Sequence, residues 1–230
     1  MKAYQKNLPL IYCHIPKMGG TSIRDLFTKA FGQNLFPHYN GQLVSSGVLI
    51  SRRPGLFVWS ELEKLAKIKP ACIYGHFRRT EKTDTDTFYP EATQFATVLR
   101  NPAETTLSSY FYTLRKIDEG VPLPMRFKSV NEWLENVNSQ IFNHMPAAAR
   151  TDPRDFIRTK LVMAATLEKM AGLNRFMAEN FSIKTQVPRL NESDRGETVD
   201  PQVLKRWISR NEGEMEFYTL VREEEARHTD

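Results

Sequence analysis

Residues 9–27 read PLIYCHIPKMGGTSIRDLF, and this stretch decides the fold. Its first part, 9–15, is a short apolar run rich in β-forming side chains, which predicts a buried strand. From Thr21 onward the apolar residues recur at the spacing of one helical face, and Gly32 is a typical helix end. The stretch therefore predicts a strand, a loop and a helix in succession.

The loop between this strand and this helix has the composition of an anion site. Gly19 and Gly20 allow a tight turn that brings backbone N–H groups close to a ligand. The helix that follows points its partial positive charge at the same place. Lys17 adds a full positive charge, and Thr21 and Ser22 add hydroxyl donors. We expect the loop to bind a phosphate-like group; a plain strand-to-helix turn with a capping Thr is the alternative.

Further along the chain, strands and helices alternate. Residues 71–77, ACIYGHF, and 95–100, FATVLR, predict two more buried strands. Helix starts are indicated by capping patterns at Ser60 with Glu63, at Asn101-Pro102, at Ser129 with Glu132, at Asp152-Pro153 and at Asp200-Pro201. The predicted helices run to about Ile68, to about Asp118, through Val137, to about Ala171 and into the C-terminus, with a break near Gly213.

This alternation indicates an α/β fold, with a parallel sheet covered by helices on both faces. Ligands of such sheets bind beyond the carboxyl ends of the strands. Residues 1–230 form one expected domain, and the sequence leaves the oligomeric state open.

The composition is that of an ordinary globular protein, with 40% hydrophobic and 26% charged residues. No stretch approaches the roughly 20 apolar residues of a membrane span, and the N-terminus does not resemble a signal peptide, so we expect a cytoplasmic protein. The net charge of +5 suits an anionic ligand, while no nucleic-acid-binding motif is present. Cys13 and Cys72 are expected to be buried free thiols, and no spacing of Cys or His predicts a metal site.

The loop differs from the P-loop, GxxxxGK[ST]. Its lysine precedes the glycines, the leading glycine is absent, and no acidic residue at a strand end is well placed for magnesium. A nucleotide kinase is therefore the second hypothesis.

The order Lys-x-Gly-Gly-Thr-Ser resembles the 5′-phosphosulfate loop of sulfotransferases. HIPKMGGTS, at 14–22, is most similar to the HIPKTGGTS stretch of the Golgi-type and heparan 2-O-type carbohydrate sulfotransferases and their bacterial relatives. One side chain departs from that pattern, since methionine stands where threonine is usual. The resemblance implies that the donor's 5′ end is held by Lys17, Met18, Gly19, Gly20, Thr21 and Ser22.

A second stretch, VLRNPAETTLSSYFY at 98–112, resembles the family's 3′-phosphate site, RDPxxRxxSxYxY. Arg100 and Ser108 match that pattern. Asn101 replaces the aspartate, and Thr105 replaces the inner arginine. An arginine offers a planar fork to phosphate, and a serine two helical turns later lies on nearly the same face. Weaker similarities to the family cover 187–193 and 214–224.

The resemblance implies a fold like that of the P-loop kinases and a defined reaction. The donor is 3′-phosphoadenosine 5′-phosphosulfate, and the product left after transfer is adenosine 3′,5′-bisphosphate. The acceptor is a hydroxyl group, and we favour a hydroxyl of a carbohydrate. No metal is required. Lys17 would stabilise the leaving oxygen, while Arg100 and Ser108 would hold the donor.

His76 is the expected base, because it follows a strand at the edge where the site should lie and an imidazole titrates near neutral pH. His14 is expected to be a structural hydrogen-bonding residue within the first strand, and His228 to be inert. The roles of His38 and His144 stay open. So does the role of Arg78-Arg79, which would either meet an anionic acceptor or be solvated. A non-catalytic nucleotide-binding module is the third hypothesis.

Overall fold

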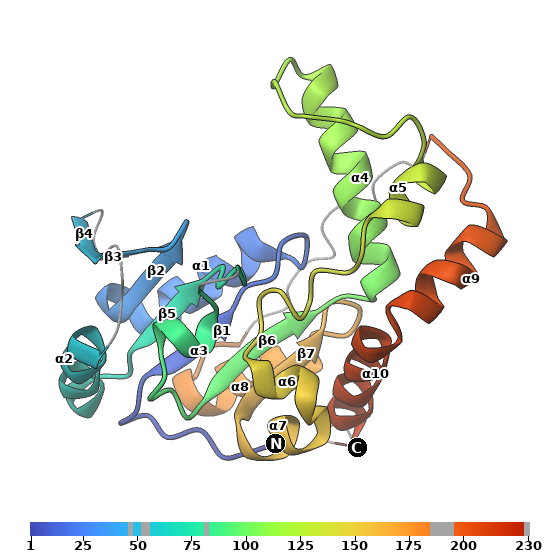
Figure 1. The fold of residues 1–230 in the computed structure, drawn as a ribbon. Coiled ribbons are helices and arrows are strands. Elements are labelled where there is room, and N and C mark those ends of the chain that lie inside the picture. The colour runs from blue at the N-terminus through green and yellow to red at the C-terminus, as the bar shows by residue number, and fades with distance from the viewer. Residues whose placement is uncertain (46–47, 52–55, 81–82, 185–195, 228–230) are drawn as a thin grey trace.

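The computed structural model describes residues 1–45, 48–51, 56–80, 83–184 and 196–227 (Figure 1). Within these residues the strands form one seven-stranded sheet in the order β4-β3-β2-β5-β1-β6-β7. The five strands from β2 to β7 in that order pair in parallel, while β3 and β4 extend the edge as antiparallel strands. The strands are β1 Leu10–Cys13, β2 Leu35–Tyr39, β3 Gln42–Ser45, β4 Val48–Ser51, β5 Cys72–Gly75, β6 Phe95–Leu99 and β7 Leu161–Thr166.

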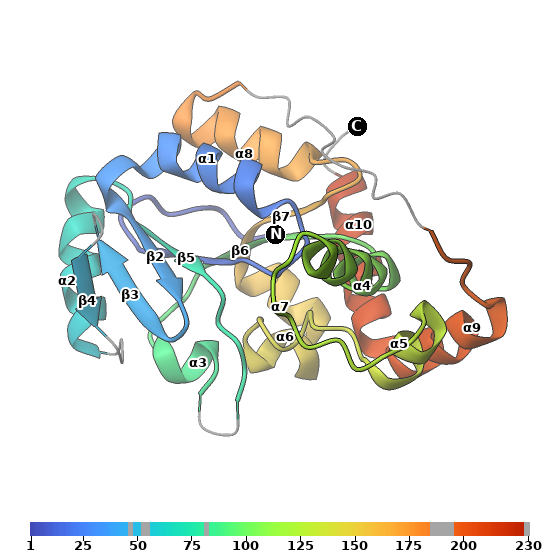
Figure 2. The same ribbon diagram turned by 90° about the horizontal axis from the view of Figure 1, so that it is seen from above.

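Helices cover both faces of this sheet (Figure 2). The described helices are α1 Gly20–Phe31, α2 Leu56–Ile68, α3 Thr85–Phe88, α4 Pro102–Asp118, α5 Val130–Asn136, α6 Ala147–Thr151, α7 Pro153–Thr159, α8 Ala171–Phe181, α9 Pro201–Arg210 and α10 Glu212–Ala226, with a short 3-10 turn at Gly32–Asn34. The expected α/β architecture, a mostly parallel sheet flanked by helices, is confirmed.

The two faces of β1 build two separate cores. Leu10 and Tyr12 pack with α1 and α8, whereas Ile11 and Cys13 pack on the opposite side with α2, α7 and α10. Side chains alternate between the faces of a strand, so a strand buried on both sides is apolar throughout. This is why the run at 9–15 reads as continuously hydrophobic. Cys13 and Cys72 are buried free thiols, as expected.

A third core lies away from the sheet, where α4, α5 and α9 pack together around the buried Trp207. In Figure 1 these helices project from the body of the molecule. The Trp207 indole N–H donates to the carbonyl of Val137 at 2.7 Å, which ties α9 to the end of α5.

The predicted starts of α4 and α5 are confirmed by their caps. The Asn101 side chain accepts the N–H groups of Ala103 and Glu104 at 3.0 and 3.3 Å, and Pro102 occupies the first helical turn. The Ser129 hydroxyl accepts the N–H of Glu132 at 3.2 Å. Each cap satisfies backbone donors that a helix start leaves unpaired.

The long helix predicted from Asp152-Pro153 to Ala171 is wrong. The helix ends at Thr159, and the apolar run Leu161–Thr166 is instead the edge strand β7, paired in parallel with β6. A short, fully apolar run fits a buried helix and a buried strand equally well, and only the vacant edge of β6 selects the strand.

Three smaller boundaries also differ. α2 begins by Leu56, so Ser60 lies inside it and is not its N-cap. His14 follows β1 rather than lying within it, and the break in the C-terminal helices falls at Asn211, two residues before Gly213. Strands β2 to β4 were not predicted, because 35–51 mix polar and apolar side chains without a clear period.

α10 is anchored to the sheet by a buried carboxylate. Glu225, only 1% exposed, accepts the N–H and hydroxyl of Thr166 at 3.0 and 2.6 Å and the N–H of Gly172 at 3.0 Å. The C-terminal helix thus closes over the carboxyl end of β7 and the start of α8.

Candidate anion-binding site

The motifs of the sequence meet at one edge of the sheet. β5, β1 and β6 are neighbours, and Cys13 at the end of β1 lies opposite Gly75 and Thr97. His76 follows β5, the loop at 14–19 follows β1, and Arg100 follows β6. Because parallel strands end on the same side, the tertiary structure brings all three to the edge where ligands of such sheets bind.

The loop takes a strained path into α1. Lys17 and Gly19 both have positive φ values, 67° and 78°, and Gly19 is the N-cap residue of the helix. A positive φ is uncommon for a lysine and is typical of functional loops. The path directs the first N–H groups of α1, which have no partner within the helix, towards the sheet edge.

Gly20 has no room for a side chain. A Cβ atom built there would lie 2.2 Å from Nε2 of His14, so the imidazole packs directly on the backbone of the loop. The hydroxyl of Tyr74 donates to the Gly20 carbonyl at 3.2 Å, which fixes the same peptide from the sheet side. The two glycines therefore have different roles. Gly19 allows the backbone turn, and Gly20 allows the close approach of His14.

Met18 is 1% exposed and belongs to the core between β1 and α2. Only its backbone can face a ligand in the loop. The methionine that replaces the usual threonine therefore leaves the loop's backbone N–H groups unchanged. Ser22 lies half-buried in the first turn of α1, while the side chain of Thr21 lies outside the described residues.

Lys17 points across to α4. Its Nζ lies 3.6 Å from the ring centroid of Tyr112, a cation–π contact. Burial, followed by the positive charges of Arg115 and Arg100, lowers the pKa of Lys17 to about 8. Each arginine disfavours the charged form of Lys17, and an anion bound beside Lys17 would stabilise that form.

α4 supplies the far wall of the site. Arg100 precedes the helix, is 21% exposed on its side chain, and contacts Glu104 at 3.5 Å. Ser108, Tyr112 and Arg115 follow at the spacing of one helical face. Ser108 is nearly buried on this face.

Arg115 is a site residue that the sequence reasoning missed. Thr105, at the position of the family's inner arginine, is buried and donates its hydroxyl to the carbonyl of Asn101 at 3.1 Å. Arg115 restores a positive charge near Lys17 from further along the same helix face. The signal was its spacing of seven residues from Ser108, which is detectable only once that helix face is known to line the site.

On the other side of β1, three histidines form a cluster. Nε2 of His76 lies 3.0 Å from Nδ1 of His14, and the same Nδ1 lies 3.3 Å from the hydroxyl of Tyr39. His144 packs edge-on against His76, with ring centroids 5.7 Å apart. The sequence predicts a structural role for His14 and leaves the role of His144 open. In the structure both residues surround the expected base, His76.

Burial keeps these imidazoles neutral. It lowers the pKa of His14 and of His144 to about 3, with a further contribution from their neighbour His76, and it lowers the pKa of His76 itself. A neutral imidazole has one bare ring nitrogen, which can accept a proton. The cluster is therefore in the protonation state that a general base requires near neutral pH.

The other aromatic and histidine side chains have structural surroundings. His38 is fully buried, contacts the Tyr89 hydroxyl at 2.9 Å, and cannot face an acceptor. Tyr110 is buried, and its hydroxyl donates to Glu197 at 2.6 Å. Trp207 is buried in the core of α4, α5 and α9, and the partly buried Trp133 packs against that core. His228 and the stretch 187–193 lie outside the described residues.

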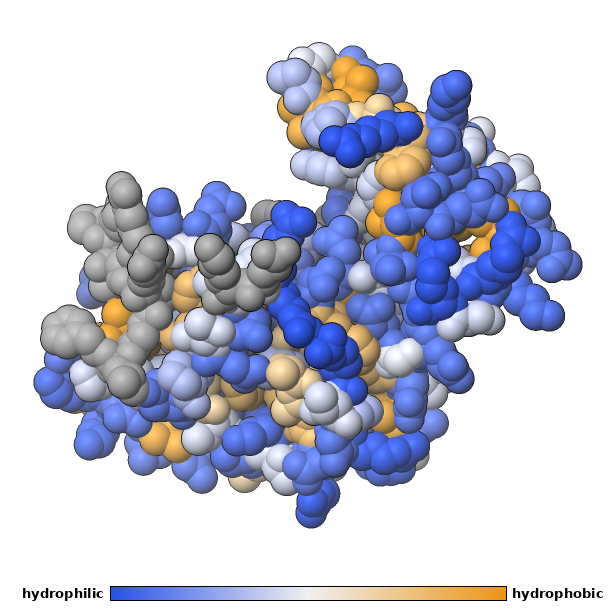
Figure 3. Space-filling model, in the orientation of Figure 1, coloured by the Kyte–Doolittle hydropathy of each residue, from blue (hydrophilic) through white to orange (hydrophobic). Residues whose placement is uncertain are grey.

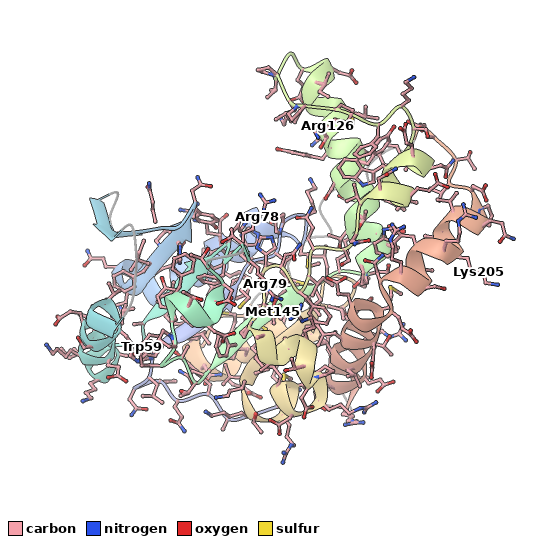
Figure 4. All side chains as sticks on the ribbon, in the orientation of Figure 1. Trp59, Arg78, Arg79, Arg126, Met145 and Lys205 are labelled. Carbon is pink, nitrogen blue, oxygen red and sulfur yellow. The ribbon has the colours of Figure 1, made fainter. Side chains whose placement is uncertain are left out.

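Arg78 and Arg79 are exposed, and only the buried Phe77 separates them from His76 in the sequence. Figure 4 shows them on the face that carries the loop after β5, facing the space beside α4. Figure 3 shows the same face hollowed between the projecting α4 region and the body of the molecule. The arginine pair is thus available to a ligand that reaches His76 from this side.

The described part of the chain contains no cluster of three or more Cys, His, Asp or Glu side chains arranged to hold a metal ion. Among the described helices, none combines the length and apolarity that crossing a bilayer would require.

Comparisons with known proteins give one structural similarity to report. No family model matches the sequence, and no curated protein matches it. The solved structure of mouse sulfotransferase SULT7A1 complexed with PAP is similar over 90% of this chain and 79% of that chain, at 13% sequence identity and a TM-score of 0.42.

Proposed function

We propose that this protein is a sulfotransferase that moves a sulfuryl group from 3′-phosphoadenosine 5′-phosphosulfate to an acceptor hydroxyl. The observation that carries this proposal is the convergence of the loop after β1, Arg100 after β6 and His76 after β5 at one sheet edge. Donor-binding groups on one side of β1 and a neutral imidazole on the other are what a two-substrate group transfer needs.

The residues present fit a donor with phosphate at both ends. The strained loop and Lys17 offer backbone N–H groups and a cation to the 5′ end. Arg100 and Ser108, at the start of α4 and on it, offer a second set of donors to the 3′-phosphate. The positive charges of Arg115 and Arg100, which lower the pKa of Lys17, support an anionic ligand beside Lys17.

In the proposed reaction, the acceptor oxygen forms a bond to sulfur as the bond from sulfur to the 5′-phosphate oxygen breaks. The acceptor proton passes to the bare nitrogen of His76. Negative charge grows on the leaving oxygen, and Lys17 with the N-terminus of α1 stabilises it. Adenosine 3′,5′-bisphosphate leaves with that charge, and each bond formed is matched by one broken.

For the acceptor, a carbohydrate hydroxyl is the favoured class. The exposed Arg78-Arg79 pair beside His76 suits a glycan that carries acidic groups. We propose a cytoplasmic protein whose residues 1–230 form a single domain, since one continuous sheet holds most of the described helices and α10 joins the core of α4, α5 and α9 to it.

The first test is calorimetric titration with adenosine 3′,5′-bisphosphate and, separately, with ATP and magnesium. Tight binding of the bisphosphate is expected, with weak or no binding of ATP. A preference for ATP would reject the proposal in favour of a kinase. Bisphosphate binding without turnover on any acceptor, in a screen of glycans with the sulfated donor, would favour a non-catalytic module.

Variants test the assignment of the site. Lys17→Ala is expected to abolish transfer, Arg100→Ala to raise the Kd for the bisphosphate, and His76→Ala to lower kcat with little change in that Kd. Lys64→Ala is the matched control, because Lys64 is 70% exposed on α2 and pairs only with a neighbouring helical glutamate. If the first two variants kept full activity and affinity, the site would lie elsewhere.

A further inference from the structure

An open cavity of about 440 Å³ lies between α1 and the end of β2. Its lining residues are His14, Gly20, Arg24, Asp25, Thr28 and Tyr39. Three of them, Gly20, Arg24 and Thr28, recur at every fourth position of α1 and so form one wall. Tyr39, the last residue of β2, lies across from this wall, with its ring centroid 5.9 Å from the guanidinium carbon of Arg24. The volume is within the range of about 300–1,000 Å³ that is typical of small-molecule sites.

This cavity adjoins the expected base. Two of its lining side chains contact His76: Nδ1 of His14 lies 3.0 Å from Nε2 of His76, and the ring of Tyr39 meets that of His76 edge-on, with centroids 4.8 Å apart. A third lining residue, Gly20, is the first residue of α1 and continues the donor loop. The groups assigned to the two phosphates of the donor line other surfaces. A ligand in this cavity would therefore lie beside the base and the donor loop, which is where an acceptor belongs.

The lining is polar and suits a saccharide. It offers the guanidinium of Arg24, the carboxylate of Asp25 and the hydroxyl of Thr28, which donates to the Arg24 carbonyl at 2.9 Å and keeps its oxygen as an acceptor. An apolar acceptor would cover these groups without giving them hydrogen bonds, which costs free energy. Sites for apolar ligands are lined mainly by hydrophobic side chains, whereas sugar hydroxyls can pair with all three groups here.

Arg24 makes the cavity positively charged. It is exposed on α1, and no ion pair between described residues involves it. Its charge reaches the facing side chains: burial is the main cause of the lowered pKa of His14, and Arg24 adds to it. Burial raises the pKa of Tyr39, and Arg24 opposes that effect. A guanidinium in such a place can form two parallel hydrogen bonds to one acidic group.

We propose that this cavity binds an acidic saccharide unit of the acceptor, whose carboxylate or sulfate ester pairs with Arg24 while Asp25 accepts hydrogen bonds from sugar hydroxyls. The proposal rests on the sulfotransferase function proposed above, and it narrows the acceptor from a carbohydrate in general to an anionic one. Arg24 is a specificity-determining residue for the acceptor and takes no part in holding the donor.

A panel of oligosaccharides tests the ligand class. It contains uronate chains beside the same chains with their carboxylates reduced to alcohols, and sulfate-ester chains beside their desulfated forms. With the sulfated donor at saturation, we expect the acidic member of at least one kind of pair to have a KM about tenfold or more below that of its neutral counterpart. Which kind of pair differs identifies the acidic group. Equal KM values within every pair, or turnover of neutral acceptors alone, would overturn the proposal.

Arg24→Ala tests whether the cavity is responsible for that preference. We expect R24A to remove the difference in KM between the acidic and neutral members and to leave the Kd for adenosine 3′,5′-bisphosphate unchanged. Lys29→Ala is the matched control, because Lys29 is an exposed cation on the same helix that does not line the cavity. Both are exposed helix positions, so the fold should tolerate the changes, and thermal unfolding checks this. A preference for the acidic member that survived in R24A would reject the assignment.

Direct binding separates this proposal from the function on which it rests. The acidic oligosaccharide with the lowest KM is titrated calorimetrically into the protein saturated with adenosine 3′,5′-bisphosphate. We expect binding to weaken about tenfold or more in R24A and to be retained in K29A. If the unmodified protein does not bind the bisphosphate, the sulfotransferase function fails. If it binds the bisphosphate and transfers sulfate, but R24A binds the acidic chain as tightly, only the assignment of the cavity fails.

Discussion

Lys17 combines three features that are unfavourable for an isolated lysine. Its φ is 67°, its ammonium is partly desolvated against the Tyr112 ring, and Arg100 and Arg115 lie close enough to lower its pKa. The left-handed φ costs folding free energy, and burial with the two arginines disfavours the charged amine, which a bound anion would stabilise. Strain concentrated at one residue is therefore the clearest residue-scale sign of a binding site.

The lowered pKa predicts how binding depends on pH. The free protein loses the Lys17 proton as pH rises through about 8. A bound phosphate favours the charged amine and raises that pKa, so binding above pH about 8 takes up one proton. We expect affinity for the bisphosphate to be nearly constant between about pH 7 and 8, where its phosphates are fully ionised, and to fall by up to about tenfold per unit above pH 8.

Calorimetry in buffers of different ionisation enthalpy measures that proton uptake directly. Lys17→Arg is the matched control, because a guanidinium stays charged over the whole range. The prediction fails if the unmodified protein and K17R show the same dependence on pH above 8.

At Gly20, a single methyl group should disable the site. Gly20→Ala places a Cβ 2.2 Å from the His14 ring, so the imidazole or the loop must move. We expect transfer activity to fall by roughly a hundredfold or more, with the fold retained. Gly213→Ala, in α10, is the control. A Cβ atom built at Gly213 lies 3.5 Å from the ring of Phe142, an ordinary van der Waals distance. Normal activity in G20A would show that His14 does not need its present position.

At the scale of elements, α10 depends on Glu225. Its carboxylate accepts three hydrogen bonds from Thr166 and Gly172 while nearly fully buried. Each buried donor left without a partner costs about 1–3 kcal/mol. Glu225→Ala is therefore expected to lower the free energy of unfolding by about 3 kcal/mol or more in urea denaturation.

The neighbouring Glu223→Ala, on the exposed side of α10, should change the free energy of unfolding little. Glu225→Gln retains one carbonyl acceptor and should lie between the two. Equal stability of E225A and E223A would mean that α10 is held by its apolar contacts alone.

β7 shows how an element can depend on its neighbour. Its six residues are all buried, and its ladder to β6 runs from the pair Phe95 and Leu161 to the pair Leu99 and Thr166. Nothing local distinguishes this run from the end of a helix that starts at Pro153. As a strand, this run forms backbone hydrogen bonds with β6. If α7 continued through these residues instead, the edge of β6 would be left unpaired.

At the scale of the molecule, the proposed ligand bridges two separately packed parts. The loop belongs to the sheet cores, while Ser108, Tyr112 and Arg115 lie on α4, which packs with α5 and α9. A ligand that contacts both should stabilise the whole chain. At a concentration of about 100 times Kd the gain is about 2.7 kcal/mol.

For a protein of this size, we expect the bisphosphate to raise Tm by roughly 5–10 °C. Differential scanning calorimetry tests this with the unmodified protein, Arg100→Ala and the control Lys64→Ala. R100A should lose most of the shift at the same ligand concentration, and K64A should retain it. An equal shift in all three would place the bisphosphate elsewhere on the molecule.

The sequence by itself determined the features that depend on neighbours along the chain. Three local signals are each present in the fold. They are the Gly-Gly pair before apolar residues at helical spacing, the Asn101 cap, and the continuous apolar runs of β1, β5 and β6. They sufficed to predict the α/β sheet, and they put the candidate anion site at its edge. The boundaries that were wrong, at β7 and α2, fall where local signals fit two structures equally.

Only the tertiary structure decided which side chains share the site. His14 and His76 are 62 residues apart in sequence and 3.0 Å apart in space, and Lys17 meets Tyr112 only because α4 starts beside β1. The order of parallel strands sets these distances, and that order is fixed by packing over the whole chain rather than by any segment. For the same reason Arg115 could be inferred as a candidate site residue only after the helix faces and strand ends had been placed together.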